Sequence, residues 1–435
     1  MKKIQEILIS TRTMAVLLLV YAVAMAVATF VENDYGTPAA KALIYNAKWF
    51  EVVMFLLILN FVGNIQRYRL LRREKWPVLV FHLAFVFIFI GGAITRYISY
   101  EGMMHIREGE TTNEIVSDRH FLKVRIEDGG DVLSYPDKPY LMSPLSYKIR
   151  AAYDFHGQRI DMKGIGYIQR KKDSLVPNAS GKEYLHIVSA GESGRVNYYL
   201  NSGETKSING MLVSFNKAIE GAVEFKKDGN QLLIRTPEDA EYMTMATQET
   251  GVNKKDEFQP LALRSLYTIG NLRLVVPEGL VKGNLIMVEG DRNKDQTLPD
   301  LLRLEIKGPK TTQIAEIPVQ AGNPELARQF NIDGMNLMIG YGPTIYNTPF
   351  AVKLDRFVLD TYPGSDSPSS FESYVQIIDN GKSTPEHIYM NNVLNYKGYR
   401  FFQSSYDPDR RGTVLSVNHD FWGTLITYIG YVFLF

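Results

Sequence analysis

One histidine, His82, lies inside a long apolar segment, where its neighbours are Phe81, Leu83, Ala84 and Phe85. Polar groups in hydrocarbon are costly, so a residue of this kind usually faces a partner or a functional cavity. A neutral imidazole with one open ring nitrogen can act as an axial ligand to haem iron. The residue type and its surroundings therefore permit iron ligation inside a membrane.

Two aromatic residues follow His82 at helical spacing. Phe85 and Phe89 stand three and seven residues later, so in a helix they share the face of His82 and could line a flat apolar macrocycle. The alternative is a histidine that forms a hydrogen bond to a neighbouring helix. From the residues alone, both interpretations remain open.

Other sequence features exclude several kinds of chemistry. Cysteine is absent, which removes thiolate metal sites, disulfides and the Cys-x-x-Cys-His haem-attachment motif. The net charge of +1 gives no indication of nucleic-acid binding. No nucleotide-binding, metalloprotease or serine-hydrolase signature is present, and we assign no catalytic residue. The other histidines lack metal-ligand spacing and are interpreted as exposed or hydrogen-bonded surface residues: His105, His120, His156, His186, His387 and His419.

Three apolar runs in residues 1–96 are long enough to span a bilayer, and the third contains His82. Residues 14–31, 50–65 and 77–94 each approach the ~20 residues that span hydrocarbon as a helix. The first run also resembles a cleavable signal peptide, but it is longer than the usual signal core, which favours an uncleaved anchor. Residues 421–435 are apolar to the last position, and we expect them to begin a fourth transmembrane helix that is truncated.

Small residues in the third run predict close helix packing. Gly91 and Gly92 follow Ala84 at about one heptad, which is typical of a face where two helix backbones approach closely. A cofactor seat at these glycines is the less favoured alternative.

Basic residues predict the orientation of these helices, because short Lys/Arg-rich flanks stay in the cytoplasm. They lie at the N-terminus and between the second and third runs: Lys2, Lys3, Arg12, Arg67, Arg69, Arg72, Arg73 and Lys75. The N-terminus is then cytoplasmic and residues 97–420 lie outside. Trp49, Trp76 and Trp422 stand at the edges of the proposed spans, where indole rings favour the headgroup layer.

In residues 97–420 the hydrophobic residues recur at every second position. Leu122, Val124 and Ile126 alternate with charged residues, and the residues around 302–306 repeat the pattern. This is typical of strands buried on one face, and hairpin turns are predicted at Asp128-Gly129, Asn209-Gly210, Asp228-Gly229 and Asn380-Gly381. We expect residues 97–420 to form an antiparallel all-β domain, either a sandwich or a partly open barrel. The polar stretch Glu241–Gln259 is interpreted as a loop or a short helix.

Several strings of residues resemble ResB-like proteins of the system II cytochrome c biogenesis machinery. They are Thr29-Phe30-Val31-Glu32, Asn46-Ala47-Lys48-Trp49-Phe50-Glu51, Phe81-His82-Leu83-Ala84, Ile90-Gly91-Gly92-Ala93-Ile94-Thr95-Arg96-Tyr97, Glu101-Gly102-Met103-Met104-His105-Ile106-Arg107, Pro349-Phe350-Ala351-Val352 and Tyr396-Lys397-Gly398-Tyr399-Arg400-Phe401-Phe402-Gln403-Ser404-Ser405-Tyr406-Asp407. They occur in order over about residues 29–113 and 349–421. The likeness is greatest to the N-terminal, ResB-like half of fused cytochrome c synthases.

This resemblance implies that His82 is a transmembrane haem ligand and that haem b is the bound or transported substrate. It implies a bacterial inner-membrane protein with a periplasmic β domain, which works with a ResC-like partner or fused half. That half would supply the opposite axial ligand and the tryptophan-rich haem-binding loop. Haem would then be attached to apocytochrome c outside the cytoplasm, with no activity expected without the partner. The alternative is a non-catalytic membrane scaffold whose outer domain binds another envelope protein.

Overall fold

The computed structural model describes residues 6–191, 194–293, 295–319, 327–365 and 367–435, so Lys2 and Lys3 lie outside the described residues. The chain divides into two compact units. One comprises Met1–Tyr167 together with Leu302–Phe435, and the other comprises Ile168–Leu301. The first unit contains the apolar helices, and both units contain β-sheets.

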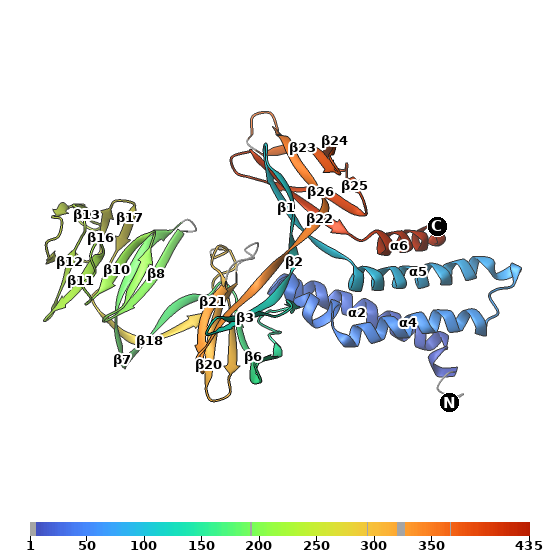
Figure 1. The fold of residues 1–435 in the computed structure, drawn as a ribbon, viewed down its shortest axis with the longest axis horizontal. Helices are drawn as coiled ribbons and strands as arrows, with labels where there is room; N and C mark the ends of the chain where they lie inside the picture. The colour runs from blue at the N-terminus through green and yellow to red at the C-terminus, as the bar shows by residue number, and fades with distance from the viewer. Residues whose placement is uncertain (1–5, 192–193, 294, 320–326, 366) are drawn as a thin grey trace. The chain divides into compact units, whose positions relative to one another are not determined.

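The helical region is built from three long apolar helices joined by short turns (Figure 1). Its elements are α2 (Thr11–Tyr35), α3 (Thr37–Ala40), the π-helix η1 (Lys41–Tyr45), α4 (Lys48–Arg67), the 3-10 turn η2 (Arg73–Lys75), α5 (Trp76–Ile98) and the C-terminal α6 (Phe421–Leu434). The three long helices are long and apolar enough to cross a membrane, and each extends beyond its predicted range at both ends. The predicted membrane bundle is confirmed.

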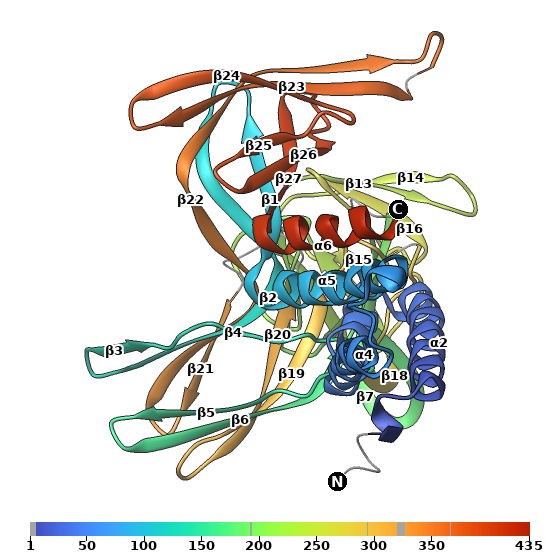
Figure 2. The ribbon, with the colours of Figure 1, turned by 90° about the vertical axis from the view of Figure 1, so that its right-hand side faces the viewer.

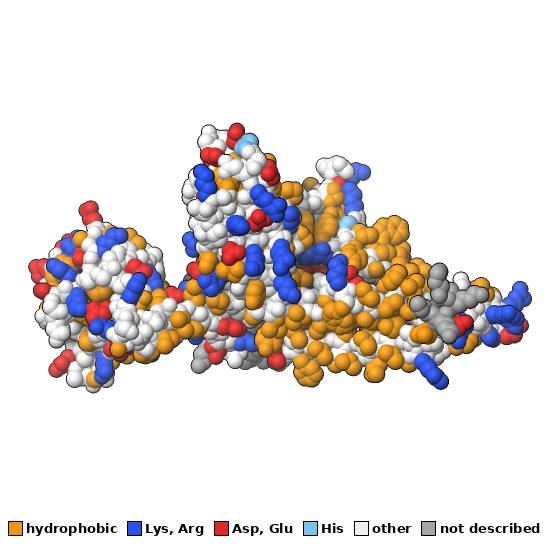
Figure 3. Space-filling view, turned by 90° about the horizontal axis from the view of Figure 1, so that it is seen from below, with side chains coloured by type: hydrophobic (Ala, Val, Ile, Leu, Met, Phe, Trp, Pro, Cys, Tyr) orange, Lys and Arg blue, Asp and Glu red, His pale blue; other side chains and the backbone are white. Residues whose placement is uncertain are grey.

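Side chains that would be buried in a soluble protein are exposed on this bundle. Hydrophobic residues cover its surface, and basic side chains gather at the end where α4 turns into α5 (Figure 3). Arg69, Arg72, Arg73 and Lys75 in that turn are all exposed. An apolar belt with a charged end is the surface expected of a helix bundle in a bilayer.

Helix α6 lies alongside α5 in both ribbon views (Figures 1 and 2). A Cβ atom added at Gly91 would stand 2.8 Å from the Thr427 nitrogen and 2.9 Å from the Gly423 oxygen. One added at Gly430 would stand 2.8 Å from the Ala84 oxygen. Gly91 and Ala84 therefore lie at a close packing contact with α6, as the sequence indicated, whereas nothing lies within 4 Å of a Cβ atom added at Gly92.

Polar groups join the helices at the end where α5 leads into the β region. The Arg96 guanidinium donates through Nη2 to Glu51 Oε1 at 2.6 Å and through Nη1 to the Tyr45 oxygen at 2.5 Å. Lys41 pairs with Asp118 at 3.2 Å, which ties η1 to strand β2. These contacts fix the end of α5 against α4 and against the start of the β region.

The described residues of the first unit form an eleven-stranded sheet and nearly all of a four-stranded sheet. The large sheet runs β24-β23-β22-β2-β1-β27-β26-β25, with β3 and β4 paired to β2 and β21 paired to β22, and the small one runs β20-β19-β6-β5. The strands are β1 (Tyr100–Arg107), β2 (Thr111–Asp128), β3 (Asp131–Ser134), β4 (Lys138–Pro139), β5 (Arg150–Phe155), β6 (Gln158–Ile168), β19 (Asp300–Lys307), β20 (Thr312–Val319), β21 (Ala327–Ile332), β22 (Met335–Thr361), β23 (Pro368–Asp379), β24 (Lys382–Tyr389), β25 (Leu394–Tyr396), β26 (Tyr399–Tyr406) and β27 (Gly412–His419).

The predicted alternating residues pack against one another between these two sheets. Leu122, Val124 and Ile126 of β2 share one core with Leu302 and its alternating neighbours in β19. The long strands β2 and β22 continue into a second core, which contains Ile115 and Phe350. The predicted all-β character of this region is confirmed, but the expectation of one wholly antiparallel domain was wrong, because Ile168–Leu301 form a separate unit in which one strand pair, Val213–Phe215 with Val223–Phe225, is parallel.

The second unit consists of a five-stranded sheet, β15-β12-β11-β10-β9, and a seven-stranded sheet, β14-β13-β16-β17-β7-β18, with β8 paired to β7. Its strands are β7 (Lys172–Gly191), β8 (Gly194–Asn201), β9 (Thr205–Ile208), β10 (Met211–Phe215), β11 (Val223–Asp228), β12 (Gln231–Arg235), β13 (Ala240–Thr244), β14 (Thr250–Asn253), β15 (Gln259–Pro260), β16 (Ser265–Ile269), β17 (Leu272–Val275) and β18 (Val281–Val288). Both sheets contribute to one hydrophobic core, which includes Phe215, Phe225 and Tyr267.

The local predictions for turns and loops were partly confirmed. Asn209-Gly210 and Asn380-Gly381 have positive φ at both residues and form two-residue hairpin turns, as predicted. The interpretation of Glu241–Gln259 as a loop or short helix was wrong, because β13 pairs with β14 there. Tyr242 stacks on the buried Tyr267 with ring centroids 5.2 Å apart, a distant contact that stabilises this polar hairpin.

Two adjacent glycines test the α5–α6 contact. Gly91→Ala should lower the free energy of unfolding by about 1–3 kcal/mol, because its Cβ would overlap the α6 backbone. Gly92→Ala is the matched control, because nothing lies within 4 Å of its added Cβ. Thermal unfolding of both variants in detergent measures the difference. Equal effects of the two substitutions would contradict the packing.

The Glu51 carboxylate allows a second internal comparison. Arg96→Ala should destabilise the protein by about 2 kcal/mol, because it leaves a largely buried carboxylate without its main partner. Lys48 pairs with the same carboxylate at 3.2 Å, but its side chain is 89% exposed. Lys48→Ala should therefore change stability by less than about 0.5 kcal/mol. Denaturant titration of both variants tests this, and similar losses would show that burial of the pair is unimportant.

Candidate functional site

His82 lies in the second turn of α5, close to the basic end of the bundle. Its Nδ1 atom is 2.8 Å from the carbonyl oxygen of Val78, one turn earlier. A carbonyl oxygen can only accept, so Nδ1 carries the proton, and in the neutral imidazole Nε2 then has the free lone pair. No hydrogen bond from the described residues reaches Nε2. His82 as a whole residue is half-buried.

The predicted neighbours of His82 meet at one ring on α4. Phe61 is 1% exposed and contacts the His82 ring edge-on, with centroids 5.6 Å apart. Phe85 stacks on Phe61 at 5.1 Å with an angle of 3° between the rings, and Phe89 lies 6.3 Å from it. The three predicted residues thus share the helix face directed toward α4, and Phe61 is the additional member.

The aromatic cluster lies at the contact between α4 and α5, where Phe61 and Phe85 stack on each other. Among the described residues, no group of three or more histidine, cysteine, aspartate or glutamate side chains could hold a metal ion. The arrangement therefore offers one imidazole beside aromatic rings.

A polar network that the sequence did not predict lies in the C-terminal half of α4. Asn60 Nδ2 donates to the oxygen atoms of Leu8 at 2.5 Å and Ser10 at 3.1 Å, and Asn64 donates to Asn60 at 2.7 Å. Arg67 Nη1 donates to the Ile9 oxygen at 3.2 Å. The network holds the residues before α2 against α4. Two asparagines in an apolar run were the available signal.

The other histidines mostly have polar partners in the β region. His105 contacts Asp407, His156 contacts Asp131, His186 contacts Asn197, and His387 contacts Glu372. His120 also has an interaction partner. His419 differs, because its ring packs between Tyr100 and Tyr399 and lines a cavity of about 370 Å³.

Two parts of the chain match a known protein-family model. The family model described as ResB-like family matches residues 72–142 and 329–424. The matched residues include α5 with His82, and they supply the paired strands β1, β2, β22 and β27 of the large sheet. The resemblance predicted from the sequence strings is confirmed over these residues.

The chain is also similar to a named protein along almost its whole length. It is 26% identical over 432 residues to Protein NrfI of Wolinella succinogenes, an alignment that covers 99% of this chain. The chain spans about a third of that relative's length, since 34% of it is aligned. The residues around Thr29 and Glu51, which lie outside the family-model match, are included in this longer similarity.

The tautomer of His82 can be measured before any ligand is added. In protein labelled with ¹⁵N-histidine, solid-state NMR should show Nδ1 of His82 protonated and Nε2 unprotonated, because Val78 accepts from Nδ1. The signal is assigned by its loss in His82→Gln. A protonated Nε2 in the ligand-free protein would contradict the geometry.

Proposed function

We propose that this chain is the haem-handling half of a cytochrome c synthase and that it holds haem in the membrane through His82. The observation that carries this proposal is the free Nε2 of a membrane-embedded imidazole whose other nitrogen is committed to Val78. A fixed Nδ1–H orients the ring and leaves Nε2 as the metal-binding atom. Haem is the carried substrate, and no residue of this chain is assigned a catalytic role.

The surroundings of His82 suit the apolar faces of a porphyrin. Phe61, Phe85 and Phe89 provide an aromatic wall next to the ligating nitrogen. His82 lies six residues after Trp76, or roughly 9 Å along the helix from its inner end. That depth allows haem to enter from the cytoplasmic side, where the exposed arginines of the α4–α5 turn would lie near its carboxylates.

Because this chain supplies one axial ligand, we propose that the haem site is shared with a second protein segment. The exposed edge of His82 leaves the far face of the haem to a second protein segment, which we propose is a ResC-like partner or fused half. The basic α4–α5 turn favours a cytoplasmic position for that end of the bundle. The β domains would then lie in the periplasm, where apocytochrome c receives the haem, and the chain would sit in the inner membrane.

Replacement of the imidazole tests the ligand directly. The protein purified from membranes should carry haem, and His82→Gly should lose at least about nine-tenths of its Soret absorbance. Added imidazole should restore haem, because it can occupy the space of the missing ring and supply the same nitrogen. Absorbance spectra of both preparations, normalised to protein, provide the measurement.

His186→Ala is the control, because this histidine lies on β7 and contacts Asn197 in the other unit. Its haem content should equal that of the unaltered protein. If His82→Gly keeps its spectrum unchanged, the ligand assignment is wrong, and a scaffold role for the β domains becomes the better account.

A further inference from the structure

The end of the helical bundle where α4 turns into α5 carries an excess of positive charge. Residues 6–12 and 67–76 meet at this end and contain six cationic side chains and two carboxylates. The cations are Arg12, Arg67, Arg69, Arg72, Arg73 and Lys75, and the carboxylates are Glu6 and Glu74. Figure 3 shows basic side chains gathered at this tip, directly beside the apolar surface of the helices.

Two of the six cations hold the local backbone together. Arg67 Nη1 donates to the carbonyl oxygen atoms of Glu6 at 3.1 Å and of Ile9 at 3.2 Å. Lys75 Nζ donates to the carbonyl oxygen of Tyr68 at 2.7 Å. These two charges therefore have structural partners within the chain.

The other four cations have no partner. Arg12, Arg69, Arg72 and Arg73 are all exposed. Among the described residues, none of their guanidinium groups takes part in an ion pair, a hydrogen bond or a ring contact. Their positive charge is therefore not compensated by this chain.

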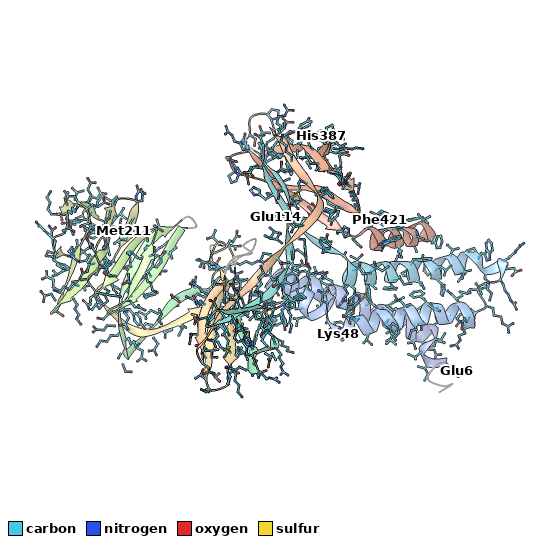
Figure 4. All side chains as sticks on the ribbon, viewed as in Figure 1. Glu6, Lys48, Glu114, Met211, His387 and Phe421 are labelled. Carbon is cyan, nitrogen blue, oxygen red and sulfur yellow. The ribbon has the colours of Figure 1, made fainter. Side chains whose placement is uncertain are left out.

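The opposite end of the bundle differs in this respect. Figure 4 shows Glu6 and Lys48 at the two ends. At the end with Lys48, the carboxylate of Glu51 pairs with Lys48 at 3.2 Å and with Arg96 at 2.6 Å. Free cations are therefore not a general property of these helices, and the excess at the α4–α5 turn needs an explanation of its own.

The backbone that carries the free arginines is held in place. Leu70 is 3% exposed, and its amide donates to the Ile65 oxygen at 3.0 Å. The hydroxyl groups of Tyr68 and Thr11 are 2.9 Å apart, so the turn is bonded to the start of α2, where Arg12 follows directly. The turn and the start of α2 thus present their arginines at one place.

Large apolar side chains are exposed next to these arginines. Leu71 is 73% exposed and Trp76 is 56% exposed. Val78 and Phe81 are also exposed, and because they stand three residues apart they share one face of α5. Indole rings favour the headgroup layer of a bilayer. A small free anion would use the charges but not this apolar face, whereas a phospholipid would use both.

We infer that the α4–α5 turn binds an anionic phospholipid, with its phosphate group on the free arginines and its acyl chains along the exposed face of α5. Guanidinium groups bind phosphate oxygen atoms through two parallel N–H donors. Clusters of about four or more cations next to a transmembrane helix are typical of acidic-lipid binding. The inference goes beyond the proposed haem-handling function and does not depend on it. The bound lipid would hold α5, and with it His82, at a defined depth in the membrane.

Lipid binding to the purified full chain tests the inference. Native mass spectrometry in an uncharged detergent compares phosphatidylglycerol with phosphatidylcholine of the same acyl chains. We expect phosphatidylglycerol to bind at least about tenfold more tightly to the unaltered protein. The triple variant Arg69→Gln, Arg72→Gln, Arg73→Gln should bind the two lipids equally, and Arg72→Gln alone should lose about threefold in affinity for phosphatidylglycerol.

A second triple variant controls for net charge. Lys382→Gln, Arg410→Gln, Arg411→Gln removes the same charge from exposed positions of the large sheet and its turns, and it should keep the preference. Without lipid, both triple variants should unfold at the temperature of the unaltered protein, because all the replaced side chains are exposed. His82→Gly should also keep the preference, since the lipid and not haem occupies the arginines in this assay.

Three results would overturn the inference. The first is a preference for phosphatidylglycerol that persists when Arg69, Arg72 and Arg73 are replaced. The second is a preference that is lost to the same extent in the control variant. The third is displacement of phosphatidylglycerol by an equal concentration of glycerol phosphate, which would assign the arginines to a small free anion. All three leave the proposed function intact, because haem binding by His82 is measured separately.

Discussion

The account depends on how a single imidazole divides its two nitrogens within a membrane. An isolated polar ring in hydrocarbon is costly, and His82 reduces this cost by donating Nδ1–H to the Val78 carbonyl of its own helix. The same bond fixes which nitrogen remains available. No other helix is needed to satisfy His82, so the free nitrogen is left for a ligand.

Helix α5 connects the features of the first unit. Its inner part carries His82, its middle contains the Gly91 contact with α6, and its outer part holds Arg96 against Glu51. It then leads directly into β1. Because each contact lies on a different level of one continuous helix, the imidazole is positioned relative to the sheet by packing and by ion pairing, without a flexible linker.

The sequence predicted features that depend on local pattern. Hydropathy located the three long helices, and period-two alternation identified the buried faces of β2 and β19. It could not show that Leu122 and Leu302 face each other, because that pairing depends on contacts nearly two hundred residues apart. The prediction for the polar hairpin of β13 and β14 was wrong for the same reason, because Tyr267, which stabilises this hairpin, lies on a later strand.

The residues of the candidate site likewise include some that the sequence predicted and some that it could not predict. His82, Phe85 and Phe89 were found from helical spacing on one element, but Phe61 lies on another helix and left no local signal. His419 appeared to be one of six scattered histidines. Its environment arises only when β1 and β26 bring Tyr100 and Tyr399 to either side of it.

The central claim is that haem iron binds the Nε2 atom of His82, and a cryo-electron microscopy map of the haem-loaded protein tests it most directly. We predict iron density joined to Nε2, with Nδ1 still within hydrogen-bonding distance of the Val78 oxygen. Iron bound at another residue in the bundle, or a His82 ring packed against a helix with no porphyrin beside it, would contradict the account.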